Sequence, residues 1–215
     1  MANSDSSTAM GDRVRIGRPS AGTQPGGQQT IIASMQKFMR STPLTNVQRL
    51  QIAEYAGVTP ALISYYFPDK LDLIIVSASP LISTYIDRVG NIINDYSDLM
   101  DRFRSLGHEF IDFNFKSGYA LDYYIDATMR RKRSDEIAEM SRQYGDLFSF
   151  MKKFVEERTV RAIDPAFLHS SLWAQCKYLG RQPHLLNITD QDEAAFAVKK
   201  LSEETFKLFT KGLLG

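Results

Sequence analysis

The amino-acid sequence predicts an all-α fold in two parts, a three-helix helix-turn-helix domain followed by a larger helical domain. Residues 45–70 read as two short helices joined by a tight turn that contains a glycine, which is the helix-turn-helix pattern. Beyond Pro80, apolar residues recur at helical spacing and no stretch alternates as a strand does. A length of 215 residues with 43% hydrophobic content is ordinary for a globular protein with a buried core.

Residues 1–27 consist mostly of Ser, Thr, Gly, Pro and Gln, a composition that cannot support a fold by itself. The segment carries Arg13, Arg15 and Arg18 at a spacing that suits an extended chain. Two interpretations stay open: a disordered tail with incidental charge, or a flexible basic arm that contacts DNA beside the helix-turn-helix.

The first helix is expected from Gln28 to Ser41. Its apolar face has to pack on the next two helices, because an isolated helix of this length is marginal in water. The residues of this face are Ile31, Ile32, Met35, Phe38 and Met39.

The second helix is expected to start at Thr45, a good N-cap with Gln48 three residues later, as in a capping box. Gly57 is expected to end it, because glycine adopts the left-handed C-terminal conformation without steric cost. Val58 follows as the buried turn residue. A stripe of small or apolar residues lets another helix cross closely, and it consists of Ile52, Ala53 and Ala56.

Thr59 and Pro60 are expected to begin the third helix as N-cap and first helical residue, with Ile63 and Phe67 facing the core and Pro68 ending the helix. The opposite face carries no charge. Such a face approaches DNA bases closely, because Ser bonds either base type and Ala contacts a thymine methyl. An ordinary helical corner is the structural alternative. The residues of the face are Pro60, Ala61, Ser64 and Tyr65.

The run IAEYAGVTPALISYYFPDK resembles the DNA-binding domain of the TetR family of transcriptional regulators, over about residues 28–75. The resemblance implies a homodimeric, all-helical, repressor-type regulator that binds a double-stranded DNA operator and carries a variable ligand-binding domain. It also implies that Lys70 grips a phosphate, against the alternative of a solvated charge.

Two positions depart from the family pattern. Ser64 stands where a phosphate-binding Tyr is usual, so that contact is expected from Tyr65 or Tyr66 instead. Arg49 stands at a usually apolar position, where it extends to solvent or lies on the phosphate backbone. The complete set of expected DNA-contacting residues is Arg13, Arg15, Arg18, Gln48, Arg49, Thr59, Pro60, Ala61, Ser64, Tyr65, Tyr66 and Lys70.

The charge distribution supports this prediction modestly. The net charge of +1 says nothing by itself about nucleic acid, but residues 1–70 hold seven Lys or Arg against four Asp or Glu. Residues 71–215 hold nineteen against twenty-one. The basic part is therefore the part with the helix-turn-helix, as attraction to phosphates requires.

The domain boundaries expected are 1–27 for the arm, 28–75 for the helix-turn-helix domain and 76–215 for a helical ligand-binding and dimerisation domain. Asp69 is expected to cap the helix that follows the helix-turn-helix, and Pro80 to interrupt its apolar run. That run is too short for a membrane span of about 20 residues.

Further helices are expected around residues 99–113, 119–129 and 135–160. The basic run at 130–133 is flanked by acids, so we interpret it as a solvated corner.

The last two helices are expected to form the contact between two subunits. One opens at Asp164 and carries a single apolar stripe. The other opens at Asp190 and carries two stripes, one with Ala194, Val198, Leu201 and Leu208 and one with Phe206, Phe209 and Leu213. A helix that is apolar on two sides needs two partners, and the second is expected to be another copy of the chain in an intersubunit four-helix bundle.

Aromatic residues are plentiful, at 11% of the chain, and those of the second domain could either form plain core or surround a cavity for a small apolar or aromatic effector. The family resemblance implies that a pocket exists. A ligand-independent DNA-binding regulator remains the alternative function. The residues expected to line the pocket are Phe103, Phe110, Phe113, Tyr119, Tyr123, Tyr144, Phe148, Trp173 and Tyr178.

No motif for catalysis, metal binding or a cofactor is recognised, so we expect a protein that is not an enzyme. His108, His169 and His184 are too scattered for a metal site, and Cys176 is expected to be a buried thiol. A single cysteine excludes an intrachain disulfide and favours the cytoplasm. The N-terminal residues contain no apolar signal segment, and no membrane span is expected.

Overall fold

The computed structural model describes residues 27–43, 47–158, 163–185, 188 and 190–214. These residues form helices and no strand, so the predicted all-α class is confirmed. The helices are α1 (Gly27–Ser41), α2 (Arg49–Ala56), α3 (Pro60–Tyr66), α4 (Lys70–Ile93), α5 (Leu99–Ser117), α6 (Ala120–Arg131), α7 (Ser134–Arg158), α8 (Pro165–Leu185) and α9 (Gln191–Leu214).

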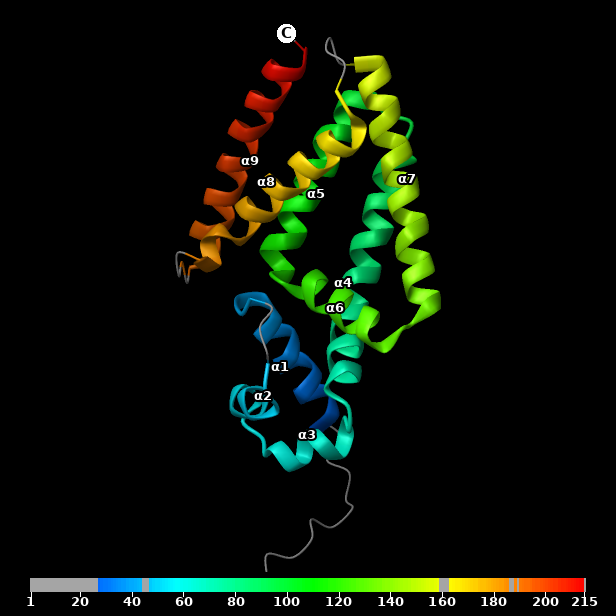
Figure 1. Ribbon diagram of the computed structural model, residues 1–215. Helices are drawn as coiled ribbons and strands as arrows, with labels where there is room; N and C mark the ends of the chain where they lie inside the picture. Colours follow the sequence, from blue (N-terminus) through cyan, green and yellow to red (C-terminus); the bar gives the residue numbers. More distant parts are fainter. Residues whose placement is uncertain (1–26, 44–46, 159–162, 186–187, 189, 215) are drawn as a thin grey trace, which may run out of the picture.

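The helices form a small unit and a larger one, connected by α4 (Figure 1). Helices α1–α3 make the small unit at one end of the molecule, and α4 runs from it into the larger unit. There α8 crosses α5, α7 lies on one outer side beside α4, and α9 packs along α8 and α5 on the other.

The start of α2 differs from the prediction. The helix begins at Arg49 with Gln48 as its N-cap, and the amide of Gln48 donates to Gln51 Oε1 at 2.9 Å. Thr45, the expected cap, lies outside the described residues. The helix ends as predicted at Gly57, whose φ of 64° is left-handed.

Helix α4 continues through Pro80, the residue that breaks the apolar run of the sequence. Pro80 has no amide hydrogen, so the helix lacks the backbone bond to the carbonyl of Val76. The helix begins as predicted at Asp69, whose carboxylate accepts from the amide of Leu71 at 2.7 Å. Within the described part of the chain, no helix is both long enough and apolar enough to cross a membrane.

Two apolar cores hold the molecule together. The first joins α1–α3 to the first part of α4 and to α6, and the second joins α5, α7, α8 and α9. The expected boundary between residues 75 and 76 falls inside α4 and inside the first core, in which Ile74, Ile75 and Ala78 are all buried. The small unit therefore shares its core with part of the larger one.

The turn between α5 and α6 is bound to the end of α1. Gly118 has a φ of 59°, and a Cβ at this position would lie 2.0 Å from the carbonyl oxygen of Arg40. The next amide, of Tyr119, donates to the carbonyl of Met39 at 2.9 Å, and Arg40 Nε donates to the carbonyl of Lys116 at 2.9 Å. Only glycine fits this close approach of two backbones.

A buried arginine of α8 holds the same turn from the other side. Arg181 is 6% exposed, and its Nε donates to the carbonyl of Gly118 at 2.9 Å. Its guanidinium pairs with Asp122 at 2.8 Å and lies 4.1 Å from the ring centre of Tyr119. The end of α1 is thus linked through one turn to α6 and α8.

The final helix has its apolar residues arranged differently from the prediction. Ala194 and Val198 are buried together with Phe206, which had been assigned to the other stripe, because a spacing of four residues keeps them on one face. Leu201, seven residues and so about two turns from Ala194, is 37% exposed at the edge of this face. The side chains of Leu208, Phe209 and Leu213 lie outside the described residues.

Candidate functional site

Helix α3 is a short helix fixed at both ends. Thr59 is its N-cap, with Oγ1 accepting from the amide of Leu62 at 3.2 Å, and Pro60 is its first residue. At the other end the amide of Phe67 donates to the carbonyl of Ile63 at 2.7 Å. Both apolar side chains are buried, so the orientation of the helix is determined by the core beneath it.

The opposite face of α3 is exposed and uncharged, as the sequence predicts. Pro60, Ala61 and Ser64 are exposed there, and Tyr65 is 74% exposed. No side chain of the described residues covers this face with a charge or a large apolar group. A flat or grooved binding partner can therefore approach this face of α3 closely.

The two tyrosines at the end of α3 have different surroundings. Their rings meet edge to face with centres 5.1 Å apart. Tyr66 is half-buried, and its hydroxyl lies so close to Gly27 that an added Cβ there would be 3.1 Å away. Tyr65 is therefore the freer of the two to take a phosphate contact.

Two expected phosphate ligands donate to the protein itself. The guanidinium of Arg49 donates to the carbonyl of Pro68, and Lys70 Nζ donates to the carbonyl of Val47 at 2.6 Å. These crossed bonds connect the start of α2 to the loop between α3 and α4. Arg49 and Lys70 therefore brace the motif, and their expected phosphate contacts stay predictions.

Most cations of the small unit have backbone partners within the chain, although a bond to a neutral carbonyl leaves their positive charge in place. Residues 27–70 contain four cations, and three of them, Arg40, Arg49 and Lys70, donate to backbone carbonyls of the chain. Lys37 is the exposed fourth. Arg13, Arg15 and Arg18 lie outside the described residues, so their expected contact with DNA stays a prediction.

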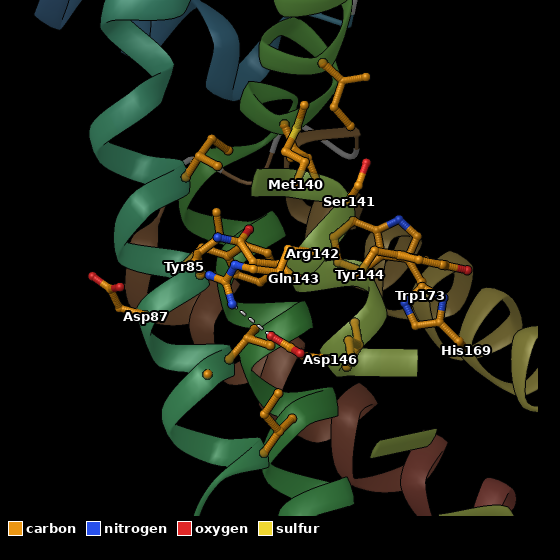
Figure 2. A pocket seen from close by; sticks show the side chains of 18 of the residues that line it. Tyr85, Asp87, Met140, Ser141, Arg142, Gln143, Tyr144, Asp146, His169 and Trp173 are labelled. Carbon is orange, nitrogen blue, oxygen red and sulfur yellow. Dashed lines mark hydrogen bonds and ion pairs between the residues drawn. The ribbon is translucent and has the colours of Figure 1, made fainter. Parts of the chain in front are cut away.

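The larger unit contains an open cavity of about 1290 Å³ between α4, α6, α7 and α8. Figure 2 shows side chains of α4, α7 and α8 around it. Most of the wall is aliphatic or aromatic. Its apolar residues are Ile82, Tyr85, Ile86, Val89, Ile93, Leu121, Ile125, Met129, Ile137, Met140, Tyr144, Leu147 and Trp173.

The expected pocket residues lie mostly elsewhere. Of the nine, Tyr144 and Trp173 line the cavity, and Phe148 packs against Tyr144 with ring centres 6.4 Å apart. Tyr178 is 58% exposed, beside a small hollow between α8 and α9. The rest are buried in the two cores, where their neighbours leave no open space: Phe103, Phe110, Phe113, Tyr119 and Tyr123.

The polar residues at the mouth of the cavity form an ion-pair cluster on α7. Arg142 donates to both carboxylate oxygens of Glu139, at 2.6 and 3.0 Å, and to Asp146 at 3.1 Å. The bond from Arg142 lowers the pKa of Glu139. Asp87 of α4 also lines the cavity. The cluster therefore holds one guanidinium between two carboxylates.

The inner wall includes His169 of α8. Burial lowers the pKa of this imidazole, and its Nδ1 is buried without a hydrogen-bond partner among the described residues. The ring of Tyr144 meets it edge to face at 5.3 Å. The lowered pKa favours the neutral imidazole at pH 7.

The basic run 130–133 at the end of α6 is exposed, in agreement with its interpretation as a solvated corner, and two of its arginines also pair with acids at the start of α4. Arg131 bonds both oxygens of Asp72, at 3.2 and 2.5 Å, and pairs with Asp69 at 3.2 Å. Arg133 pairs with Asp72 at 3.5 Å. Asp69 is the N-cap of α4 and follows α3 by only two residues.

No catalytic or metal centre stands out in the described part of the chain. No group of three His, Cys, Asp or Glu side chains there could hold a metal ion. Cys176 is buried, and burial raises the pKa of its thiol to about 12. His108 Nδ1 is hydrogen-bonded to Ser202 Oγ at 2.8 Å.

Similar solved structures are transcription regulators. A candidate regulator of fatty acid metabolism from Clostridium perfringens has a TM-score of 0.58 at 14% identity, over 86% of this chain and 99% of its own. A TetR family transcription regulator from Marinobacter aquaeolei VT8 has a TM-score of 0.52 at 13% identity, over 83% of this chain and 95% of its own. The fatty acid degradation regulator FadR from Bacillus halodurans has a TM-score of 0.52 at 15% identity, over 82% of this chain and 92% of its own.

No family model matches the sequence, and no curated protein matches it. At the identities found, the likeness establishes the fold. The chain has the fold of TetR-family transcription regulators, with the helix-turn-helix of α2 and α3 ahead of a helical domain.

Proposed function

We propose that this chain is a dimeric transcriptional regulator that acts in the cytoplasm and binds a two-fold DNA operator through α3. The observation that carries the proposal is the capped, exposed and uncharged face of α3 with Ala61, Ser64 and Tyr65. The regulator fold of the structural neighbours supports it. We propose further that a ligand in the cavity weakens DNA binding, as in a repressor released by its effector.

The outer faces of α8 and α9 supply the proposed contact between two copies. Phe167, Tyr178 and Phe196 are 68%, 58% and 69% exposed, and Leu201 is partly exposed. Large apolar side chains exposed on two helices that pack against each other favour an interaction surface there. A two-fold dimer formed there presents two α3 helices, which suits half-sites one or two helical turns apart.

Selection from random duplex DNA tests the recognition role. The wild-type chain is expected to enrich a motif with two-fold symmetry. Ser64→Tyr is expected to change the enriched sequence, since Ser64 faces the bases in the proposal. Lys70→Ala is the matched variant, expected to weaken binding to all sequences alike because phosphate contacts position without specifying. Selection that enriches no two-fold motif would refute the operator proposal.

The arm is proposed to add positive charge to that of the small unit. Arg18 lies between Gly17 and Pro19, a setting that suits an arginine lying flat in a narrow minor groove. Deleting residues 1–20 is expected to leave the melting temperature unchanged and to weaken DNA binding. If all three arginines neutralise phosphates, the log–log salt slope falls by up to about 2.7 per arm, from ~0.9 each. An unchanged slope would identify a tail without a DNA contact.

Coupling between ligand and DNA is proposed to pass through α6. Leu121, Ile125 and Met129 of α6 line the cavity, and Arg131 at its end is bonded to Asp69 beside α3. A ligand that displaces α6 shifts this bond and with it the start of α4. The expected coupling is about 1–3 kcal/mol, equal in both directions.

A ligand-independent regulator is the alternative function. Thermal shift against a metabolite panel separates the two, because a cavity ligand raises the melting temperature as its concentration rises. A bound compound whose affinity is the same with and without the operator would be excluded as an effector.

A further inference from the structure

We infer that the cavity between α4 and α7 takes a hydrophobic cation, a ligand with one positive charge on an aromatic or alkyl body. The inference names the class of effector, and it rests on the proposed function only for its effect on DNA. Binding itself follows from the wall and the mouth of the cavity.

The wall suits the apolar body of such a ligand. The cavity volume of about 1290 Å³ exceeds that of a typical drug-sized molecule. Ile86, Ile125 and Met140 give aliphatic contact from three helices. The aromatic rings of Tyr144 and Trp173 also line the cavity (Figure 2), and ring faces attract cations, most strongly where water is excluded.

The mouth has a negative balance. Asp87 lies on the α4 side and Asp146 on the α7 side, against the single guanidinium of Arg142. Two carboxylates and one guanidinium leave one negative charge among the lining side chains, and Glu139, bonded to Arg142, adds a further carboxylate beside the lining. Among the described lining residues Arg142 is the one permanent cation, and the neutral His169 adds no positive charge.

An anionic ligand is disfavoured by the bonds that Arg142 already makes. Its Nε and both Nη atoms donate to Glu139 and Asp146. A carboxylate or phosphate that approached Arg142 would have to displace one of these carboxylates and leave it uncompensated. A cation meets the opposite situation, because the carboxylate of Asp87 attracts it while the bond from Arg142 to Asp146 stays in place.

Two ions of nearly the same size and shape but opposite charge test the inference. Tetraphenylphosphonium is the cation, and tetraphenylborate is the anion. The chain contains one tryptophan, Trp173, and it lines the cavity, so its fluorescence reports binding at this site. The titrations use the full-length protein without DNA, at a fixed salt concentration. The phosphonium ion is expected to quench Trp173 and to bind at least about tenfold more tightly than the borate ion.

A pair of variants shows whether the mouth causes this preference. Asp146→Asn removes a carboxylate that pairs with Arg142, and it is expected to weaken phosphonium binding about three- to tenfold and to strengthen borate binding. Asp101→Asn is the matched control, since Asp101 is equally exposed and pairs with Arg104 at 3.2 Å on α5. The control is expected to leave both affinities unchanged.

Three results would overturn the inference: equal affinity for the two ions, tighter binding of tetraphenylborate, or no quenching by either ion. Failure of the proposed function gives a different pattern. The phosphonium ion would then bind with the expected preference, while selection from random DNA would enrich no two-fold motif.

Discussion

Replacing Gly118 with alanine is expected to break the junction between α1 and the turn from α5 to α6. Gly118 has φ 59° and ψ −109°, a conformation essentially confined to glycine, and forcing another residue into it costs about 1–3 kcal/mol. The new Cβ would also lie 2.0 Å from the carbonyl oxygen of Arg40, so the two backbones must separate. Separation breaks the bond from the Tyr119 amide to Met39, and an unsatisfied buried amide costs about 1–3 kcal/mol more.

The sum is about 2–6 kcal/mol, which for a chain of this size lowers the melting temperature by roughly 2–4 °C per kcal/mol. Thermal unfolding followed by circular dichroism measures the shift. Gly145→Ala is the control, since Gly145 lies within α7 with open space around it. This change is expected to stabilise the chain by about 0.5–1 kcal/mol. A melting temperature of Gly118→Ala within about 2 °C of wild type would refute the described junction.

Three further changes test other parts of the structure. Gly107→Ala would place a Cβ 1.7 Å from the ring of Phe206, so Phe206 and the part of α9 that carries it have to move. Because α9 belongs to the proposed dimer contact, sedimentation is expected to show a dimer that dissociates at least about tenfold more readily. Burial lowers the pKa of His108 in the folded chain from its ordinary value of 6.5. The unfolded chain therefore binds more protons than the folded chain when the pH falls below 6.5. The stability contributed by His108 is therefore fully present above pH 6.5 and is lost as the pH falls below this value. Denaturant titrations are expected to show a weaker pH dependence for His108→Gln, a change that also alters the bond to Ser202. The thiol of Cys176, with its pKa raised to about 12, is expected to react with iodoacetamide far more slowly in the native than in the unfolded protein.

The helix-turn-helix unit was predictable because its signals are local. Gly57 ends α2, Thr59 and Pro60 begin α3, and Asp69 begins α4, as the residue types at those positions require. Each depends on the backbone within a few residues. The start of α2 was missed because Gln48 caps the helix, a residue type that only weakly favours the N-cap position.

The cavity was predicted as a feature but not located. A stripe of aromatic residues such as Phe103, Phe110 and Phe113 shows that a helix face is apolar, and core and cavity wall have that property in common. The distinction depends on how far the neighbouring helix lies, which is set by contacts distant in sequence. Successive turns of α4 and α7 line the cavity instead, mostly with aliphatic side chains such as Ile86 and Met140.

The roles of the charged residues were also outside the reach of sequence patterns. Arg49 and Lys70 each donate to a backbone carbonyl about twenty residues away, and Arg131 pairs with Asp69 and Asp72 across about sixty. A carbonyl is present at every residue, so no residue type marks it as a partner. Such contacts become visible only when the helices are packed.

The structure of the chain bound to its selected duplex tests the central claim most directly. The account predicts two copies on one duplex, in contact through α8 and α9, with both α3 helices in the major groove. Ala61 and Ser64 would then face base edges, and Lys70 would lie near a phosphate. A complex in which the face of α3 points away from the DNA, or in which a single copy binds, would contradict the account.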